Sequence, residues 1–532
     1  MFAQLLTPVA GGLGFSFIVA ALPIATVLVL MGVMRRPAWE ASLAGLAVGL
    51  VLAIAVWRLP PILALDSVAA GATFALWPIM WIVFNAILLF NIAVSSGRFD
   101  AFRGWVIRYL PGDRRIVLVV IGFCFGALLE GVAGFGTPVA ITSALLIMTG
   151  FEPLEALTFT LIFNTAPVAF GALGAPVTTL AAVTGLPDTV LGAMIGRQLP
   201  VFALLLPFYV IGVYGGWRSI KALWPALLVA GGSFALTQFV VSNYLSYALT
   251  DVLSSLASLI VTTSFLRLWK PAPDPEFALA PVAAAPASVT APLWQGWLPW
   301  IVVSAVVIAW TVLKFNLIGQ VKVPWPGLDK AVFITLYKQA YAAVWTFQPL
   351  ATGTAILASA VITAALVGCG PKAFIDAAIS AGRQIRLAVL TVAVIIALAY
   401  LMNYSGMNYT LGLGVASVGA LFPLISVFLG WVAVFLSGSD TSGNALFGNL
   451  QVVAARQLGL SPVLFAAANS SGGVMGKMIS PQNISTGVST TALKGHEGLV
   501  LARTFKHSLA LTLLLGLLVA AQQHLLSWMI AR

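Results

Sequence analysis

The sequence predicts an all-α polytopic membrane protein with about 12–14 transmembrane passes. Of its 532 residues, 61% are hydrophobic and only 8% are charged, whereas soluble domains carry about 25% charged residues. Ten stretches are apolar over the roughly 20 residues that a helix needs to cross a bilayer. Two further regions, 116–185 and 408–490, are apolar but interrupted by glycine, proline and small polar residues. These interruptions favour broken helices.

The basic loops set the expected direction of the spans. The ten apolar stretches are 15–34, 38–57, 72–95, 190–214, 222–241, 246–266, 297–315, 347–368, 386–402 and 505–529. Basic residues at 35–36 and throughout 97–115 follow the first and third spans, so the positive-inside rule places the N-terminus outside. The same counting puts the lysine-bearing loop 322–345 outside, where the rule expects few lysines. We attribute the net charge of +11 to basic loops that orient the spans in a lipid bilayer. We therefore expect no nucleic-acid partner.

The chain is expected to contain two membrane halves that share an internal repeat. A Pro/Ala-rich linker, 271–296, separates an N-terminal half, 1–270, from a C-terminal half, 297–532. Each half contains an acid, a Gly-x-x-Pro, an Asn followed by Ser or Thr, a Gly and a Pro in the same order, within repeat cores 116–187 and 408–490. One additional span precedes the second core, which predicts that the two repeats are inverted relative to each other.

Two carboxylates are the proton-coupling candidates. Glu130 and Asp440 are the only charged residues within 116–151 and 387–455 respectively. A charge at bilayer depth costs roughly 2.5–3.5 kcal/mol and usually marks a substrate or ion path. The alternative is that each acid caps free backbone N–H groups at a helix break and never titrates. Asp251 lies near a span end and is expected to face water.

The broken segments are expected to form re-entrant hairpins around a small anion. Irregular backbone at bilayer depth is tolerated only inside the protein or beside a cavity, and helix N-termini bind anions. Lys477 is the only charge in 457–493; it is expected to face a substrate carboxylate, to pair with one of the two acids, or to snorkel to the interface. The substrate-binding candidates are Thr137, Asn164, Thr165, Ser439, Thr441, Asn444, Asn469, Ser470, Ser471 and Lys477.

The sequence argues against an enzyme and against a cofactor. The two cysteines and three histidines are too dispersed to predict a metal site. The segment Gly472-Gly-Val-Met-Gly-Lys477 has the wrong glycine spacing for a phosphate-binding loop, so ATP-driven pumping is not expected. The residues alone therefore predict a secondary transporter of a small anion, and they set no oligomeric state.

Four long motifs resemble the lactate permease family of bacterial secondary transporters. They are Phe125-Gly-Ala-Leu-Leu-Glu-Gly-Val-Ala-Gly-Phe-Gly-Thr-Pro-Val-Ala-Ile141, Asn164-Thr-Ala-Pro-Val-Ala-Phe-Gly-Ala-Leu-Gly174, Ser437-Gly-Ser-Asp-Thr-Ser-Gly-Asn-Ala-Leu-Phe-Gly-Asn-Leu-Gln451 and Ala467-Ala-Asn-Ser-Ser-Gly-Gly-Val-Met-Gly-Lys-Met-Ile-Ser-Pro-Gln482. The resemblance implies uptake of L-lactate, often also D-lactate and glycolate, together with protons across the bacterial inner membrane. Two alternatives stay open, a sodium-coupled carboxylate transporter of the same architecture and an anion channel.

Overall fold

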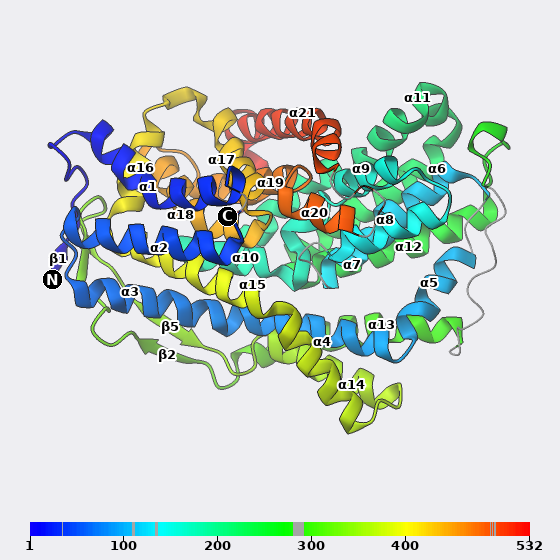
Figure 1. The fold of residues 1–532 in the computed structure, drawn as a ribbon, viewed down its shortest axis with the longest axis horizontal. Helices are drawn as coiled ribbons and strands as arrows, with labels where there is room; N and C mark the ends of the chain where they lie inside the picture. Colours follow the sequence, from blue (N-terminus) through cyan, green and yellow to red (C-terminus); the bar gives the residue numbers. More distant parts are fainter. Residues whose placement is uncertain are drawn as a thin grey trace.

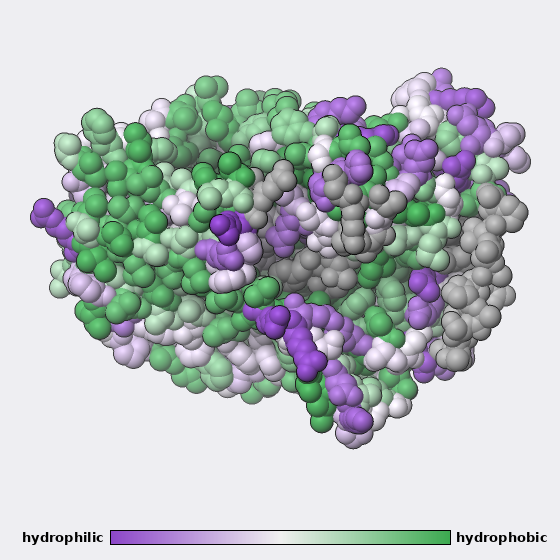
Figure 2. All heavy atoms as spheres, viewed as in Figure 1, coloured by the Kyte–Doolittle hydropathy of each residue, from purple (hydrophilic) through white to green (hydrophobic). Residues whose placement is uncertain are grey.

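The computed structural model describes residues 1–34, 36–108, 112–132, 137–279, 292–489, 491, 493 and 496–532. These residues are mostly helical, with a few short strands, which confirms the predicted all-α membrane class (Figure 1). Apolar side chains cover the face over α1 and α2, and hydrophilic side chains gather around the turn of α11 at the opposite end of the molecule (Figure 2). An apolar belt with polar ends is the surface that a bilayer requires.

The N-terminal half contains twelve α-helices among the described residues. They are α1 (Leu13–Gly32), α2 (Ala38–Ala55), α3 (Pro61–Phe74), α4 (Trp81–Ser95), α5 (Arg98–Arg108), α6 (Arg114–Val117), α7 (Gly126–Val132), α8 (Thr137–Met148), α9 (Pro153–Phe163), α10 (Gly171–Thr184), α11 (Asp188–Tyr244) and α12 (Thr250–Leu268). Wide π-type turns at Ala75–Met80 and Leu118–Phe125 join α3 to α4 and α6 to α7.

The C-terminal half contains nine more α-helices in the described part of the chain. They are α13 (Leu298–Val312), α14 (Thr352–Leu366), α15 (Pro371–Ser405), α16 (Met407–Ala416), α17 (Phe422–Ser437), α18 (Asp440–Gln457), α19 (Pro462–Lys477), α20 (Pro481–Ser489) and α21 (Glu497–His524).

Ten helices in the described residues are long and apolar enough to cross a membrane, and the bent α9–α10 pair raises the number to eleven. The 57 residues of α11 would extend about 85 Å as one straight helix, far beyond the roughly 30 Å of a hydrocarbon core. Gly216, with φ of 68°, breaks α11 into two pieces of crossing length. Counting α11 twice brings the total to the lower end of the predicted range of 12–14.

The two predicted core regions contain the broken helices that their sequences indicate. In the first, α9 and α10 meet at an angle of 64°, and Ala172, Leu173 and Gly174 adopt left-handed backbone at the bend. In the second, α17 and α18 form a helical hairpin whose tip contains Gly438, with φ of 71°. Glycine favours this left-handed conformation because it carries no Cβ. The first core therefore contains a broken helix and the second a helical hairpin, while the internal repeat stays a prediction.

A small β-structure lies at the N-terminal end of the molecule (Figure 1). Its strands are β1 (Phe2–Ala3), β2 (Val321–Pro324), β3 (Val332–Ile334), β4 (Gln339–Ala340) and β5 (Val344–Phe347). Strand β3 pairs in parallel with β1 and antiparallel with β4, while β2 and β5 form a separate antiparallel pair. We call residues 321–347 the β-cap. Because β3 pairs with β1, the lysine-bearing loop lies on the same side as the N-terminus, as counting of spans indicates.

The first part of the predicted linker is anchored to the helices. Asp274 accepts hydrogen bonds from Arg115 and Arg218, each at 3.4 Å. Phe277 packs beneath the Arg115 guanidinium, which lies 4.3 Å from the centre of its ring. Residues 280–291 lie outside the described part of the chain. Residues 271–279 therefore make specific contacts with the helices.

Candidate functional site

The acids of the two cores meet around one buried cavity. This cavity, about 30 Å³ in volume, is lined by Glu130, Val168, Gly171, Ala172, Pro176, Gly438, Ser439, Asp440, Thr441, Lys477 and Gln482. Its walls come from the α7 end, the α9–α10 bend, the α17–α18 hairpin tip and the end of α19. Its volume is enough for a water molecule or two. We call it the central cavity.

Glu130 forms a buried ion pair with Lys477. The Lys477 Nζ lies 2.6 Å from Glu130 Oε1, and both residues are at most 5% exposed. Asn164, which terminates α9 at the bend, donates from Nδ2 to Glu130 Oε2 at 2.9 Å. Of the alternatives for Lys477, snorkelling is therefore wrong, and pairing with an acid describes this structure. The ion pair joins the two repeat cores across the cavity.

Asp440 is equally buried but has no cation within ion-pair distance among the described residues. Its Oδ2 accepts hydrogen bonds from the Ser470 hydroxyl and from Asn444 Nδ2. Its Oδ1 has no hydrogen-bond partner. Asp440 is also the first residue of α18, where the positive end of the helix dipole stabilises an anion.

The described contacts do not support the capping alternative for either acid. The N-cap of α18 is Ser439, whose hydroxyl accepts from the Ser442 N–H at 3.3 Å. Glu130 and Asp440 accept instead from side chains. The Ser442 N–H at the hairpin tip is thus capped by Ser439 and not by Asp440, and Asp440 Oδ1 has no hydrogen-bond partner.

The remaining substrate-binding candidates differ in whether they line the central cavity. Ser439 and Thr441 line the central cavity, and Asn469 supports Asn444 by donating to its Oδ1 at 3.0 Å. Two candidates point elsewhere, because Thr165 donates to the Ile162 carbonyl and Ser471 donates to Gln198 on α11. The side chain of Thr137 lies outside the described part of the structure.

Sequence reasoning missed one carboxylate. Asp251 was expected to face water, but it is fully buried on α12, and neither of its oxygens has a hydrogen-bond partner. It packs against α7, since a Cβ added to Gly131 would lie 3.1 Å from the Asp251 carboxylate. Asp251 therefore lies beside the residue that follows Glu130. A buried acid without partners carries a large desolvation cost when ionised.

Two glycines give the acids their space. A Cβ at Gly171 would lie 3.0 Å from Glu130 Oε1, and a Cβ at Gly473 would collide with Asp440 Oδ1. Because a side chain at either position would push on a carboxylate, these glycines set how closely α10 and α19 approach the acids. Their pattern in the sequence resembles ordinary small-residue helix packing, so it did not distinguish them.

A larger cavity adjoins the central one. It has a volume of about 820 Å³ and shares Ser439 and Gln482 with the central cavity. Part of its wall is formed by Arg36 and Pro37, between α1 and α2, and by Trp39 at the start of α2. Since α1 is a candidate span, this cavity lies at the opposite end of α1 from the N-terminus. In this structure the central cavity therefore adjoins the side where the basic loops are expected.

The described residues contain no group of three His, Cys, Asp or Glu side chains placed to hold a metal ion.

Comparison with known proteins gives a consistent picture. The model of the family described as L-lactate permease matches residues 16–526. An L-lactate permease of Salmonella typhimurium is 40% identical, with 98% of this chain and 98% of the relative covered. A glycolate permease of Escherichia coli K12 is also 40% identical, again with 98% of each chain covered.

One solved structure shares the fold at low sequence identity. The antimetabolite efflux pump MtrF of Neisseria gonorrhoeae is 13% identical, with 93% of this chain and 96% of the pump covered, and the TM-score is 0.50. At this identity the likeness concerns the arrangement of the helices alone.

Proposed function

Because the chain belongs to the L-lactate permease family, we propose that it takes up L-lactate by proton symport across the bacterial inner membrane, with D-lactate and glycolate as further substrates. The family makes it a multi-pass membrane transporter. The observation that carries the finer proposal is the buried Glu130–Lys477 ion pair in the wall of the central cavity. The charges of this ion pair suggest how the transport of lactate and the transport of a proton would be coupled.

A substrate carboxylate and Glu130 compete for the same cation. When lactate binds Lys477, the Glu130 carboxylate loses its partner and would remain as a buried, unpaired charge, which is strongly unfavourable. A proton on Glu130 removes that charge. The site then holds Lys477, the lactate anion and a neutral Glu130, and its net charge equals that of the ion pair alone. Substrate and proton are coupled because neither is favourable without the other.

Asp440 would recognise the 2-hydroxyl group. Its Oδ1 has no hydrogen-bond partner, and a hydroxyl donates well to a carboxylate. The central cavity is too small for lactate in this structure, so binding requires the α17–α18 hairpin or the α9–α10 bend to move. The adjoining cavity of about 820 Å³ offers room for this movement on one side.

Purified protein in liposomes tests the proposal. Radiolabelled L-lactate uptake is followed under an inward proton gradient, with a sodium gradient as a parallel arm. Protein-free liposomes and an uncoupler are the controls, because lactic acid itself crosses lipid. We expect accumulation that the proton gradient drives and the uncoupler abolishes.

The other outcomes separate the rival functions. Accumulation that requires sodium would replace proton symport by sodium coupling. Fast equilibration without accumulation under either gradient would indicate a channel. Absence of any lactate flux above the lipid control would contradict the substrate assignment.

A further inference from the structure

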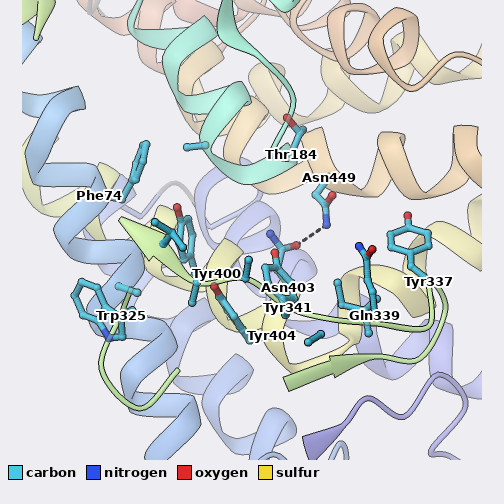
Figure 3. Close-up of a pocket in the computed structure, with 18 of the residues that line it drawn as sticks. Phe74, Thr184, Trp325, Tyr337, Gln339, Tyr341, Tyr400, Asn403, Tyr404 and Asn449 are labelled. Carbon is cyan, nitrogen blue, oxygen red and sulfur yellow. Dashed lines mark hydrogen bonds between the residues drawn. The ribbon is translucent and has the colours of Figure 1, made fainter. Parts of the chain in front are cut away.

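We propose that an aromatic pocket beneath the β-cap is a second, outer binding site for short 2-hydroxycarboxylates, where the substrate is captured before it reaches the central cavity. The choice of ligand rests on the proposed function. The pocket has a volume of about 530 Å³, within the range of sites for small ligands. We call it the outer pocket (Figure 3).

The outer pocket combines packed aromatic rings with buried amides. Tyr341 of the β-cap packs against Tyr404 of α15, with ring centres 4.2 Å apart and ring planes tilted by 30°. On the inner wall, Asn449 donates to Asn403 Oδ1 at 2.7 Å (Figure 3), and both side chains are at least 93% buried. Such rings contact a methyl group, and such amides bind hydroxyl and carboxylate oxygens. Burial raises the pKa of Tyr341 to about 12, so its hydroxyl stays a neutral donor at physiological pH.

Arg456 provides the positive charge that an anion requires. It lines the outer pocket with its guanidinium 5.0 Å from the centre of the Tyr337 ring. Among the described residues it forms no ion pair with an acid within 4 Å, and its side chain is exposed. An arginine held over an aromatic ring at the mouth of a polar pocket offers its planar fork of donors to a carboxylate.

Helix α18 connects the outer pocket to the central cavity. Asp440 begins the helix at the central cavity, and Asn449 in the middle of the helix and Arg456 near its other end line the outer pocket. The 18 residues of α18 extend about 27 Å. The outer pocket is also lined by residues of β3 and β4, in the sheet that contains β1, on the side that the basic loops assign to the outside. The outer pocket and the cavity of about 820 Å³ therefore lie toward opposite ends of α18.

A barrier between α10 and α18 separates the outer pocket from the central cavity in this structure. The two cavities share no lining residue. Between them, a Cβ added to Gly448 would lie 2.6 Å from Leu180 Cδ1 and 3.3 Å from Val183 Cγ2, so α10 and α18 touch closely there. A substrate in the outer pocket must wait until this contact opens, which is the behaviour of a capture site.

Ligand protection of an introduced cysteine tests the outer site directly. The full-length protein carries Gln339→Cys in the pocket wall and Cys369→Ser, and an impermeant maleimide is added to cells. At L-lactate ten times its Kd, we expect labelling to slow about tenfold. Protection should persist with Asp440→Asn and disappear with Arg456→Gln. Lys338→Cys, exposed and beside the pocket wall, is the matched control and should label equally with and without lactate.

Uptake kinetics provide the second readout. Arg456→Gln should raise the KM for L-lactate roughly tenfold to a hundredfold through loss of a charge-assisted contact while the maximal rate is kept. Lys338→Gln removes the same charge from the same end of the protein and should leave the KM unchanged. Equal effects of the two substitutions would mean general electrostatic attraction and would overturn the proposal.

The labelling result is readable whether or not the protein transports lactate. Proton-driven accumulation without protection of Gln339→Cys would overturn the outer site and leave the proposed function standing. Protection that depends on Arg456, in a protein that does not accumulate lactate, would support the outer site and contradict the symport. Protection at Lys338→Cys as well would indicate a general conformational change and would overturn the site.

Discussion

The two halves of the central site hold their acids in opposite ways. Glu130 lies near the end of a helix, paired with Lys477 and supported by Asn164. Asp440 lies at the start of a helix with neutral donors alone. The two carboxylates, which the predicted repeat would place at corresponding positions, therefore have different electrostatic partners. Under the proposed mechanism, this difference lets Glu130 exchange its cation with a substrate while Asp440 provides a fixed hydrogen-bond acceptor.

Loss of the lysine should have the largest effect. Lys477→Gln leaves Glu130 buried without a counter-charge, which costs about 3–5 kcal/mol, so we expect poor folding and no uptake. Thermal unfolding in detergent and lactate uptake are the measurements. The double variant Glu130→Gln/Lys477→Gln should recover thermal stability without recovering transport. Unchanged stability of the single variant would show that the ion pair does not hold the two cores together.

Neutralising Glu130 should separate transport from coupling. Glu130→Gln frees Lys477 to bind lactate without a proton, so we expect exchange of internal for external lactate to continue while accumulation driven by the proton gradient is lost. Counterflow and gradient-driven uptake in the same liposomes measure the two activities. If Glu130→Gln accumulates lactate normally, Glu130 does not carry the proton.

Neutralising Asp440 should weaken binding and spare coupling. Asp440→Asn removes the charge from one hydrogen bond to the substrate hydroxyl, which corresponds to roughly tenfold or more in KM. Accumulation at saturating lactate should remain. The discrimination between lactate and propionate, which lacks the hydroxyl, should fall in competition assays. Loss of accumulation in this variant would move the proton from Glu130 to Asp440.

A methyl group introduced at Gly473 should disturb Asp440 and leave Glu130 unaffected. Gly473→Ala forces a Cβ into Asp440 Oδ1, and overpacking of this kind costs about 1–3 kcal/mol. We expect a lower thermal midpoint and a raised KM with coupling preserved. Gly232→Ala is the matched control, because its Cβ would meet only Leu204 Cδ1 at 3.9 Å. Equal effects at both positions would point to general helix packing.

The smallest effect on stability is expected at the third acid. Asp251→Asn loses no hydrogen bond, since neither carboxylate oxygen has a partner, so the free energy of unfolding should change by no more than about 1 kcal/mol. Lactate accumulation is the decisive measurement. If Asp251→Asn loses as much lactate accumulation as Glu130→Gln, Asp251 is the proton carrier. The roles proposed for Glu130 and Asp440 would then be wrong.

The sequence was sufficient to locate the acids and insufficient to assign their partners. A charge in a long apolar run has a clear energetic cost, which identifies Glu130 and Asp440 without a structure. Lys477 and Glu130 are 347 residues apart, and no local pattern decides which acid a distant lysine pairs with. Asp251 was placed wrongly because closeness to a span end predicts exposure only when no neighbouring helix covers that end. Here α7 covers it.

For the fold too, local sequence patterns predicted the helices, whereas contacts between distant segments could not be predicted. Apolar length predicted the spans, and glycine and proline predicted the breaks in both cores. The β-cap was missed because its strands have two to four residues, too few to show a period of two. Its tyrosines contact tyrosines of segments that only tertiary packing brings together.

The pairing of β1 with β3 imposes an order on biosynthesis. Phe2 leaves the ribosome about 330 residues before its partner Val332, which at 5–20 residues per second is a delay of tens of seconds. During that interval the N-terminal segment must cross the membrane and remain unpaired while the thirteen described helices α1–α13 are made. The β-cap closes only after β3 and β4 have followed it across. Its closure would therefore report that more than half of the chain has inserted in the correct direction.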